Sequence, residues 1–292
     1  MKTLVLTLAL ASGFSASIGA ALAQDAKEPE AVWLALEQGK KAKPIAFAQD
    51  VKEREDVSEF KNQLVKPAGK GLFPAVVIMS SCAGVNDALV SRAKELLDAG
   101  FAVLTVDSFG PRNKQWWACL DVMTYQMADT FDALKHLQKF DVINKQRIFG
   151  AGWSTGIMGP MVATSPEGRK QAGSELGFAA VVSHYGNCMY QEKPSFPPVH
   201  ILRNDVDKPV LMLLAESDVP VSNCFPLLEE LKKAGKPVEF HTFSGAHHLW
   251  DRADETRVSR ENGFGQKITF KYSPDITKDA TQRMVDFFNR FK

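Results

Sequence analysis

The feature that most constrains the fold of this chain is an alternation of short apolar runs with amphipathic stretches, from about residue 58 to the C-terminus. The runs are rich in Val, Ile, Leu and Phe, as in strands that are buried on both faces of a parallel sheet. The expected strands are residues 75–80, 102–107, 147–150, 179–183, 209–215 and 238–243, and the expected helices between them include 87–99, 125–140 and 225–234. Gly100 and Gly235 stand where two of these helices should stop. Strand and helix in alternation predict an α/β fold, with a mostly parallel central sheet and helices on both faces.

The first residues resemble an export signal rather than part of this fold. Lys2 supplies a positive charge, residues 4–18 are almost wholly apolar or small, and Ala21-Leu22-Ala23 has the small-residue cleavage pattern. A membrane anchor is the alternative, but the run is short for a span of about 20 residues. We therefore expect residues 1–23 to be removed, leaving one domain over 24–292 with a peripheral N-terminal segment at about 24–57. The mature protein would be periplasmic or secreted.

The charge balance excludes some partners. The chain has 35 basic and 34 acidic residues, which gives no electrostatic reason to bind nucleic acid or an anionic membrane. After residue 23 no stretch is long and apolar enough to cross a bilayer. The four cysteines form no C-x-x-C pair, so a zinc site is not expected, and in an exported chain they predict two disulfides. We expect neither a metal nor an organic cofactor, and the oligomeric state stays open.

A serine motif follows one of the expected strands. Strand 147–150 runs into Gly152-Trp153-Ser154-Thr155-Gly156, a G-x-S-x-G match that is followed by the helix-prone residues 157–164. In a nucleophile elbow the serine occupies a tight strand-to-helix turn, and the flanking glycines let strand and helix pack closely. The position between a buried strand and a helix makes Ser154 the candidate nucleophile.

A serine hydroxyl needs a base, and the base needs an acid to orient it. Strand 209–215 ends at Glu216-Ser217-Asp218, and the last expected strand ends at Ser244-Gly245-Ala246-His247-His248. The order serine, acid, histidine is the one that α/β hydrolases use. The pattern alone leaves Glu216 or Asp218 as the acid and His247 or His248 as the base.

Four segments resemble the dienelactone hydrolase family: residues 73–78, Val106–Arg112, Gly152–Gly156 and Gly245–His248. The resemblance covers about residue 60 to the C-terminus. It implies that Asp218 is the acid and His248 the base. It also implies that the backbone N–H groups of Cys82 and Thr155 form the oxyanion hole, where such donors contribute a few kcal/mol each in the transition state.

The chain departs from the family pattern at two positions. The best-known members use a cysteine nucleophile that is gated by a glutamate in an early loop, whereas this chain has Ser154 and, at the matching loop position, Ser81. Serine has no accessible anion near neutral pH, so we expect His248 to take its proton within the reaction. The departures weaken the case for a dienelactone as the natural substrate.

Several residues are candidates for contact with substrate. Arg252 stands at the spacing after His248 where the family has a carboxylate-binding arginine, and Arg112 is a second candidate. Guanidinium groups bind carboxylates in a bidentate manner, which would favour an anionic ester or lactone. The alternative is a surface arginine paired with Asp251 or Asp254. Trp116 could form a pocket wall or cover the sheet, and His184 and Tyr185 could line the pocket or belong to the core.

Four cysteines allow three pairings, and we expect Cys82–Cys119 and Cys188–Cys224. Each pair would join loops near the carboxyl ends of strands, and consecutive strands of such sheets commonly lie side by side. Some exported relatives of dienelactone hydrolase have cysteines at these four places, and that resemblance implies the same pairing.

These observations predict a serine hydrolase that cleaves a carboxylic ester or lactone through an acyl-enzyme on Ser154. Acyl transfer to an alcohol is a close alternative that the sequence does not separate from hydrolysis. A non-catalytic binding protein of the same fold is the alternative from another class, although such a protein would not need Ser154, Asp218 and His248 together. A two-lobed solute receptor would require an internal duplication, and the sequence has none.

Overall fold

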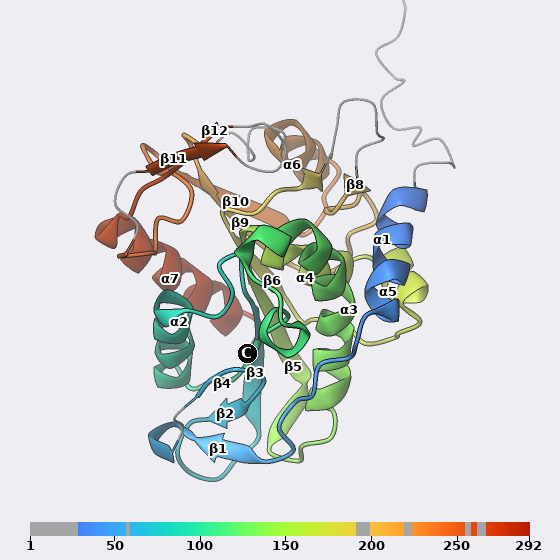
Figure 1. Ribbon diagram of the computed structural model, residues 1–292, viewed down its shortest axis with the longest axis vertical. Coiled ribbons are helices and arrows are strands. Elements are labelled where there is room, and N and C mark those ends of the chain that lie inside the picture. The colour runs from blue at the N-terminus through green and yellow to red at the C-terminus, as the bar shows by residue number, and fades with distance from the viewer. Residues whose placement is uncertain (1–28, 57–58, 191–198, 219–223, 255–257, 262–266) are drawn as a thin grey trace, which may run out of the picture.

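An eight-stranded sheet lies at the centre of the computed structural model, which describes residues 29–56, 59–190, 199–218, 224–254, 258–261 and 267–292 (Figure 1). Across the sheet the strands follow the order β1 (Val51–Glu53), β2 (Leu64–Lys66), β4 (Ala102–Val106), β3 (Phe73–Met79), β5 (Ile143–Trp153), β6 (Val181–His184), β9 (Val210–Ala215) and β10 (Val238–Phe243). Every neighbouring pair is parallel except β2 and β4, which are antiparallel. The mostly parallel sheet predicted from the sequence is confirmed.

Helices cover both faces of this sheet (Figure 1). The helices are α1 (Pro29–Lys41), α2 (Asp87–Asp98), α3 (Cys119–Leu137), α4 (Met158–Val162), α5 (Pro166–Ala172), α6 (Cys224–Lys233) and α7 (Pro274–Asn289). Side chains of α2 and α7 pack on one face, and side chains of α1, α3, α4 and α6 pack on the other.

Strand β3 shows why the chain forms this sandwich. Val76 and Ile78 belong to the core beneath α2 and α7, whereas Val77 and Met79 belong to the core beneath α3 and α4. All four side chains are fully buried. Successive side chains of a strand point to opposite faces, so a continuously apolar strand needs a helical layer on each side. Each such side chain contributes about 1.5–3 kcal/mol on burial.

The helix ends follow local chemistry. Helix α2 begins after Asn86, whose side-chain oxygen accepts a hydrogen bond from the backbone N–H of Leu89 (3.1 Å). It ends before Gly100, which takes a positive φ of 86°, and Gly235 takes a φ of 69° after α6. Both glycines stop a helix as the sequence predicts, because glycine adopts this left-handed conformation without strain.

The N-terminal segment that we expected to be peripheral packs against the sheet and its helices. Val32 and Leu36 of α1 are buried in the core on the α3 side, and strands β1 and β2 extend the sheet beyond β4. Helix α3 also begins at Cys119, six residues before the expected start at 125. Two small antiparallel pairs were not expected, β7 (Met189–Tyr190) with β8 (Val199–His200) and β11 (Val258–Glu261) with β12 (Lys267–Phe270).

Short 3-10 turns complete the described elements: η1 (Arg54–Asp56), η2 (Gly110–Arg112), η3 (Trp116–Ala118) and η4 (Ser154–Ile157). Within the described ranges, none of the helices has the length and apolar character needed to span a bilayer. The expected signal peptide, residues 1–23, lies outside the described residues.

Candidate active site

Ser154 lies at a tight turn between β5 and η4, and its backbone has a positive φ of 52°. The glycines on either side leave space for this turn. A Cβ on Gly152 would lie 2.6 Å from Cα of Ile157, and a Cβ on Gly156 would lie 2.4 Å from the carbonyl oxygen of Met79. Any side chain at these two positions would collide with backbone. The G-x-S-x-G segment therefore forms the elbow expected from the sequence.

The elbow brings Ser154 next to two polar side chains from other strands. The Ser154 Oγ lies 2.9 Å from Nε2 of His248, and Nδ1 of the same ring lies 2.5 Å from Oδ2 of Asp218. Asp218 follows β9 and His248 follows β10, so the loops after three strands meet at one edge of the sheet. Asp218 and His248 are both buried, which strengthens the polar contacts between them.

The structure separates the two acids and the two histidines that the motif left open. The Glu216 carboxylate is exposed and accepts hydrogen bonds from the Ser244 hydroxyl and the Gly245 N–H, both at 2.9 Å. These bonds brace the turn after β10. It is Asp218 that lies against the imidazole, and it is the ring of His248 that contacts Ser154.

The loop after β3 lies beside the elbow. The Cys82 Sγ is 3.4 Å from the Thr155 hydroxyl, which places the two expected oxyanion residues side by side. The Gln126 side chain of α3 donates to the carbonyl of Ser80 (2.6 Å), and the Ala83 N–H donates to the Ser81 hydroxyl (3.2 Å). The loop is thus fixed from α3 and from within.

Two disulfides are present, Cys82–Cys119 and Cys188–Cys224. Their Cα atoms are 5.1 and 5.2 Å apart, within the usual range for this bond. The pairs are those expected from the sequence. The first ties the loop after β3 to the start of α3, and the second ties the segment after β6 to the start of α6.

Comparison with known families settles the chain's membership, since the profile of the dienelactone hydrolase family matches residues 60–292. The chain belongs to the dienelactone hydrolase family. It is accordingly a hydrolase that acts on ester bonds. No relative among the curated proteins matches the chain.

Solved structures agree in fold. A candidate dienelactone hydrolase from Klebsiella pneumoniae is 19% identical, with a TM-score of 0.58 over 77% of this chain and 90% of that one. A dienelactone hydrolase-like promiscuous phosphotriesterase from metagenomic libraries is 15% identical, with a TM-score of 0.56 over 76% and 88%. An esterase from Thermogutta terrifontis, with propionate bound, is 13% identical, with a TM-score of 0.52 over 77% and 87%. The architecture is that of an α/β hydrolase.

Arg112, the second arginine considered for a substrate carboxylate, is already paired within the protein. Its guanidinium forms a bidentate ion pair with Asp129 of α3 (2.7 and 2.8 Å) and donates to the carbonyls of Lys43 and Ser108. Its side chain is only 6% exposed, and Asp129 only 1%. Arg112 therefore fixes the loop after β4 to α3 and is not placed to hold a substrate carboxylate. This placement does not support the contact between Arg112 and a substrate carboxylate that we expected from the sequence.

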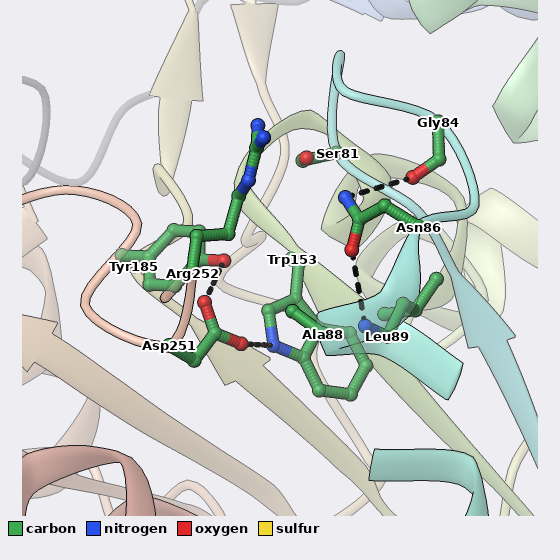
Figure 2. Close-up of a pocket in the computed structure, with 9 residues that line it drawn as sticks. All are labelled: Ser81, Gly84, Asn86, Ala88, Leu89, Trp153, Tyr185, Asp251 and Arg252. Carbon is green, nitrogen blue, oxygen red and sulfur yellow. Dashed lines mark hydrogen bonds between the residues drawn. The ribbon is translucent and has the colours of Figure 1, made fainter. Parts of the chain in front are cut away.

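Arg252 remains near the site. Its guanidinium pairs with Asp254, one of the two partners considered from sequence, and the side chain is 17% exposed. It lines a small cavity of about 10 Å³, the space of one water molecule. Figure 2 shows Arg252 extending past Tyr185 toward Ser81, in the loop that also carries Cys82.

The aromatic candidates divide between core and surface. Tyr185 is buried, and its ring centroid lies 4.8 Å from that of His248. His184 is buried behind it and stacks on Trp153 (4.4 Å between centroids), and this burial lowers the pKa of His184 to about 3. Trp116 is 66% exposed and meets Trp117 edge to face. His184 is therefore a neutral core residue, Tyr185 packs against the candidate base, and Trp116 does not cover the sheet.

Sequence reasoning missed the contacts that Asp251 makes with this group. Asp251 is buried and accepts hydrogen bonds from the Tyr185 hydroxyl (2.7 Å) and from the indole N–H of Trp153 (2.8 Å). Both contacts join residues far apart in sequence, so no local pattern reveals them. The available signal was an acid three residues after the candidate base, which we read only as a partner for arginine.

Proposed function

We propose that this protein is a serine hydrolase that cleaves a carboxylic ester or lactone through an acyl-enzyme on Ser154. The proposal rests above all on one observation, the continuous set of contacts from Ser154 Oγ through the His248 ring to Asp218. A serine, a histidine and a buried carboxylate in this order have the geometry that nucleophilic catalysis requires.

The proposed reaction begins when the Ser154 oxygen attacks the carbonyl carbon of the ester. The Ser154 proton passes to Nε2 of His248, while Nδ1–H donates to Asp218 and keeps the ring in the required tautomer. The carbonyl oxygen becomes an oxyanion, which the N–H groups of Cys82 and Thr155 are proposed to bind. Collapse of this intermediate breaks the bond to the alcohol oxygen, which takes the proton from His248.

The acyl-enzyme is then hydrolysed. His248 takes a proton from water as the water oxygen attacks the acyl carbon, which gives a second tetrahedral intermediate. Collapse of this intermediate breaks the bond between the acyl carbon and Ser154 Oγ, and Oγ keeps the electron pair and takes the proton back from His248. The products are a carboxylic acid and free enzyme, so the cycle needs no redox partner. For a lactone, the acid and alcohol remain in one molecule.

An anionic substrate is part of the proposal. The pair between Arg252 and the exposed carboxylate of Asp254 is only partly buried, and such pairs contribute about 0–1 kcal/mol. Breaking this one pair, so that the Arg252 guanidinium can bind a substrate carboxylate, therefore costs little. Arg112 offers no second anchor, since Asp129 already occupies it.

We also propose that the protein works outside the cytoplasm after removal of residues 1–23. The two disulfides support an oxidising compartment, where such bonds persist. Mass spectrometry of the protein from a periplasmic fraction tests this, with Gln24 as the expected first residue. An intact Met1 or free thiols in that fraction would contradict the proposal.

A fluorophosphonate probe tests the central claim, because it phosphonylates only an activated serine. We expect a single adduct on Ser154 by peptide mapping and none in Ser154→Ala. A parallel screen with p-nitrophenyl esters of graded acyl length and with small lactones identifies the substrate class. Absence of labelling in the folded wild-type protein would instead favour a binding protein that has retained these side chains.

A further inference from the structure

One buried carboxylate connects the loops that carry the candidate nucleophile and base. Asp251 lies three residues after His248, and its Oδ1 accepts a hydrogen bond from the Tyr185 hydroxyl (2.7 Å). Its Oδ2 accepts from the indole N–H of Trp153 (2.8 Å), as Figure 2 shows. Trp153 is the last residue of β5 and Tyr185 directly follows β6. Asp251 thus joins the ends of two strands to the loop after β10.

Both partners of Asp251 are next to a reacting side chain. Trp153 immediately precedes Ser154, so its indole fixes the strand end from which the elbow turns. The Tyr185 ring packs against the His248 ring at 4.8 Å and meets Trp250 edge to face at 4.7 Å. Displacement of Asp251 would therefore shift the supports of Ser154 and His248 together.

The backbone around Asp251 is strained. Among the described residues, three positive-φ positions are neither glycine nor asparagine: Ser154 (52°), Tyr185 (40°) and Leu249 (54°). Ser154 follows a partner of Asp251, Tyr185 is a partner, and Leu249 lies two residues before Asp251. Strained conformations of this kind cost about 1–3 kcal/mol each and persist only where the surrounding contacts hold them. The two hydrogen bonds to Asp251 are such contacts.

The stability of the fold does not by itself explain why residue 251 is a buried carboxylate. Burial raises the pKa of Asp251, although the hydrogen bond from Tyr185, the nearby charge of Arg92 and the hydrogen bond from Trp153 oppose the rise. Well-packed apolar residues in place of a buried charge are often neutral or stabilising. A costly group that holds strained backbone beside a reacting serine and histidine points to a role in their geometry.

We propose that Asp251 is a positioning residue which, through Trp153 and Tyr185, holds Ser154 Oγ and His248 Nε2 at reacting distance. This role rests on the proposed function of Ser154. Among the described residues, no hydrogen bond joins Asp251 to the Ser154 or His248 side chain, so Asp251 acts through its two partners. Substitution of Asp251 should therefore change the reaction rate of the folded enzyme, in addition to any change in its stability.

The test measures the second-order rate constant for phosphonylation of Ser154 in folded protein, together with kcat and KM. A misplacement of about 1 Å can cost about 100-fold in rate. We expect Asp251→Ala and Tyr185→Phe to lower the labelling rate and kcat by about 10- to 100-fold with little change in KM. Asp251→Asn should lose less, because one amide can accept from Trp153 and donate to the Tyr185 oxygen.

Two control variants remove comparable groups elsewhere. Tyr125→Phe removes a hydroxyl from α3, and Ser165→Ala removes a buried hydroxyl that donates to Asp205 (2.7 Å) and caps α5 by accepting from Gly168 (3.0 Å). Ser165→Ala should lower the melting temperature but leave the labelling rate of folded protein unchanged.

The possible failures are distinguishable. If wild-type protein is not labelled at Ser154, the proposed function is wrong and the role of Asp251 falls with it. If wild-type protein is labelled and folded Tyr185→Phe and Asp251→Asn react at the wild-type rate, only the positioning role is overturned. Circular dichroism at the assay temperature establishes that each variant is folded, and the two conservative variants keep the test valid if Asp251→Ala does not fold.

Discussion

Ser154 occupies a backbone conformation that costs a residue with a side chain about 1–2 kcal/mol. The cost is tolerated because Gly152 and Gly156 allow the turn to pack directly on Ile157 and on the end of β3. The same packing sets the direction of the Ser154 side chain, whose Oγ reaches His248 without a bridging group. At the scale of single residues, the position of the proposed nucleophile thus depends on Gly152 and Gly156, because neither has a side chain that would collide with the backbone of the turn.

The first prediction concerns the proposed nucleophile, Ser154, and the proposed base, His248. Ser154→Ala and His248→Ala should each lower kcat by at least about 10⁴-fold while the fold is retained, because the residues act as one unit. For the same reason the double variant should be little worse than either single variant. Hydrolysis of a p-nitrophenyl ester measures the loss.

His247→Ala is the matched control for the base, since it removes an imidazole from the adjacent position. It should retain most of the activity. A damaging His247→Ala beside a benign His248→Ala would show that the base is assigned to the wrong histidine.

The second prediction concerns Arg252. Arg252→Gln should raise KM by about 10-fold or more for an ester that carries a carboxylate, because a charge-assisted hydrogen bond contributes about 1.5–3 kcal/mol. KM for a neutral ester of the same size should stay unchanged. Arg290→Gln is the control, since Arg290 is an exposed arginine paired with Glu239 on β10. An equal rise in KM for both esters would mean that Arg252 shapes the site without binding a carboxylate.

At the scale of elements, β6 and α7 enclose an ionisable side chain that stays neutral. His184 ends β6, stacks on Trp153 of β5 and places its Nε2 3.5 Å from the Met284 sulfur of α7. Burial lowers its pKa to about 3, with a smaller contribution from the positive charge of Arg92. The packing between sheet and helix therefore depends on this ring remaining unprotonated.

The third prediction follows from the direction of that shift. The unfolded chain protonates His184 near pH 6.5, whereas the folded chain resists protonation down to about pH 3, so the stability it contributes above pH 6.5 is lost as the pH falls toward 3. Between pH 7 and pH 5 this amounts to about 2 kcal/mol.

Urea unfolding of wild type and His184→Phe at pH 7 and pH 5 measures this contribution. Phenylalanine keeps a ring against Trp153 but cannot be protonated. Between pH 7 and pH 5, the free energy of unfolding of the variant should therefore fall by about 2 kcal/mol less than that of wild type. The comparison is between variants, since His136 and His241 also have lowered pKa values and act in the same direction. Equal losses in both proteins would contradict the prediction.

The elements that the sequence predicted well are those with strong local patterns. The runs that became β3, β4 and β9 are almost wholly apolar, and glycine marks the ends of α2 and α6. Strands β1 and β2 are three residues each and lack such a pattern, so only pairing with the sheet reveals them. The early start of α3 coincides with a tertiary bond, since its first residue, Cys119, is joined to Cys82 by a disulfide.

At the scale of the whole molecule, the proposed site lies where loops from distant parts of the chain converge. The order serine, acid, histidine anticipated that Ser154 would meet an acid after β9 and a histidine after β10, because the carboxyl ends of parallel strands lie at one edge of a sheet. The choice of Asp218 and His248 came from the resemblance to the family. The sequence did not predict the contacts between side chains that lie far apart in the chain. The pairing of Arg112 with Asp129 and the contacts of Asp251 with Trp153 and Tyr185 depend on side-chain directions that only the assembled layers define.

The two disulfides offer an internal comparison at this scale. They close loops of 37 and 36 residues, so each should stabilise the fold by about 4 kcal/mol in the chain-entropy account. Their surroundings differ. Cys188 and Cys224 are fully buried in the core, whereas Cys82 and Cys119 are partly exposed beside the elbow. A thiol reagent should therefore reach Cys82–Cys119 first.

The last prediction is that mild reduction lowers kcat before it unfolds the protein. Opening Cys82–Cys119 frees the loop whose N–H is proposed to bind the oxyanion, and loss of one such donor costs about 100- to 1,000-fold in kcat. Cys188–Cys224 should stay closed until the core opens, and it braces the start of α6, which follows the segment after Asp218. Differential alkylation with peptide mapping identifies the open bond, while circular dichroism and ester hydrolysis follow fold and activity in the same sample. Full activity with Cys82 and Cys119 alkylated, or prior opening of Cys188–Cys224, would contradict this account, because in either case the exposed bond would not be what holds the oxyanion loop in place.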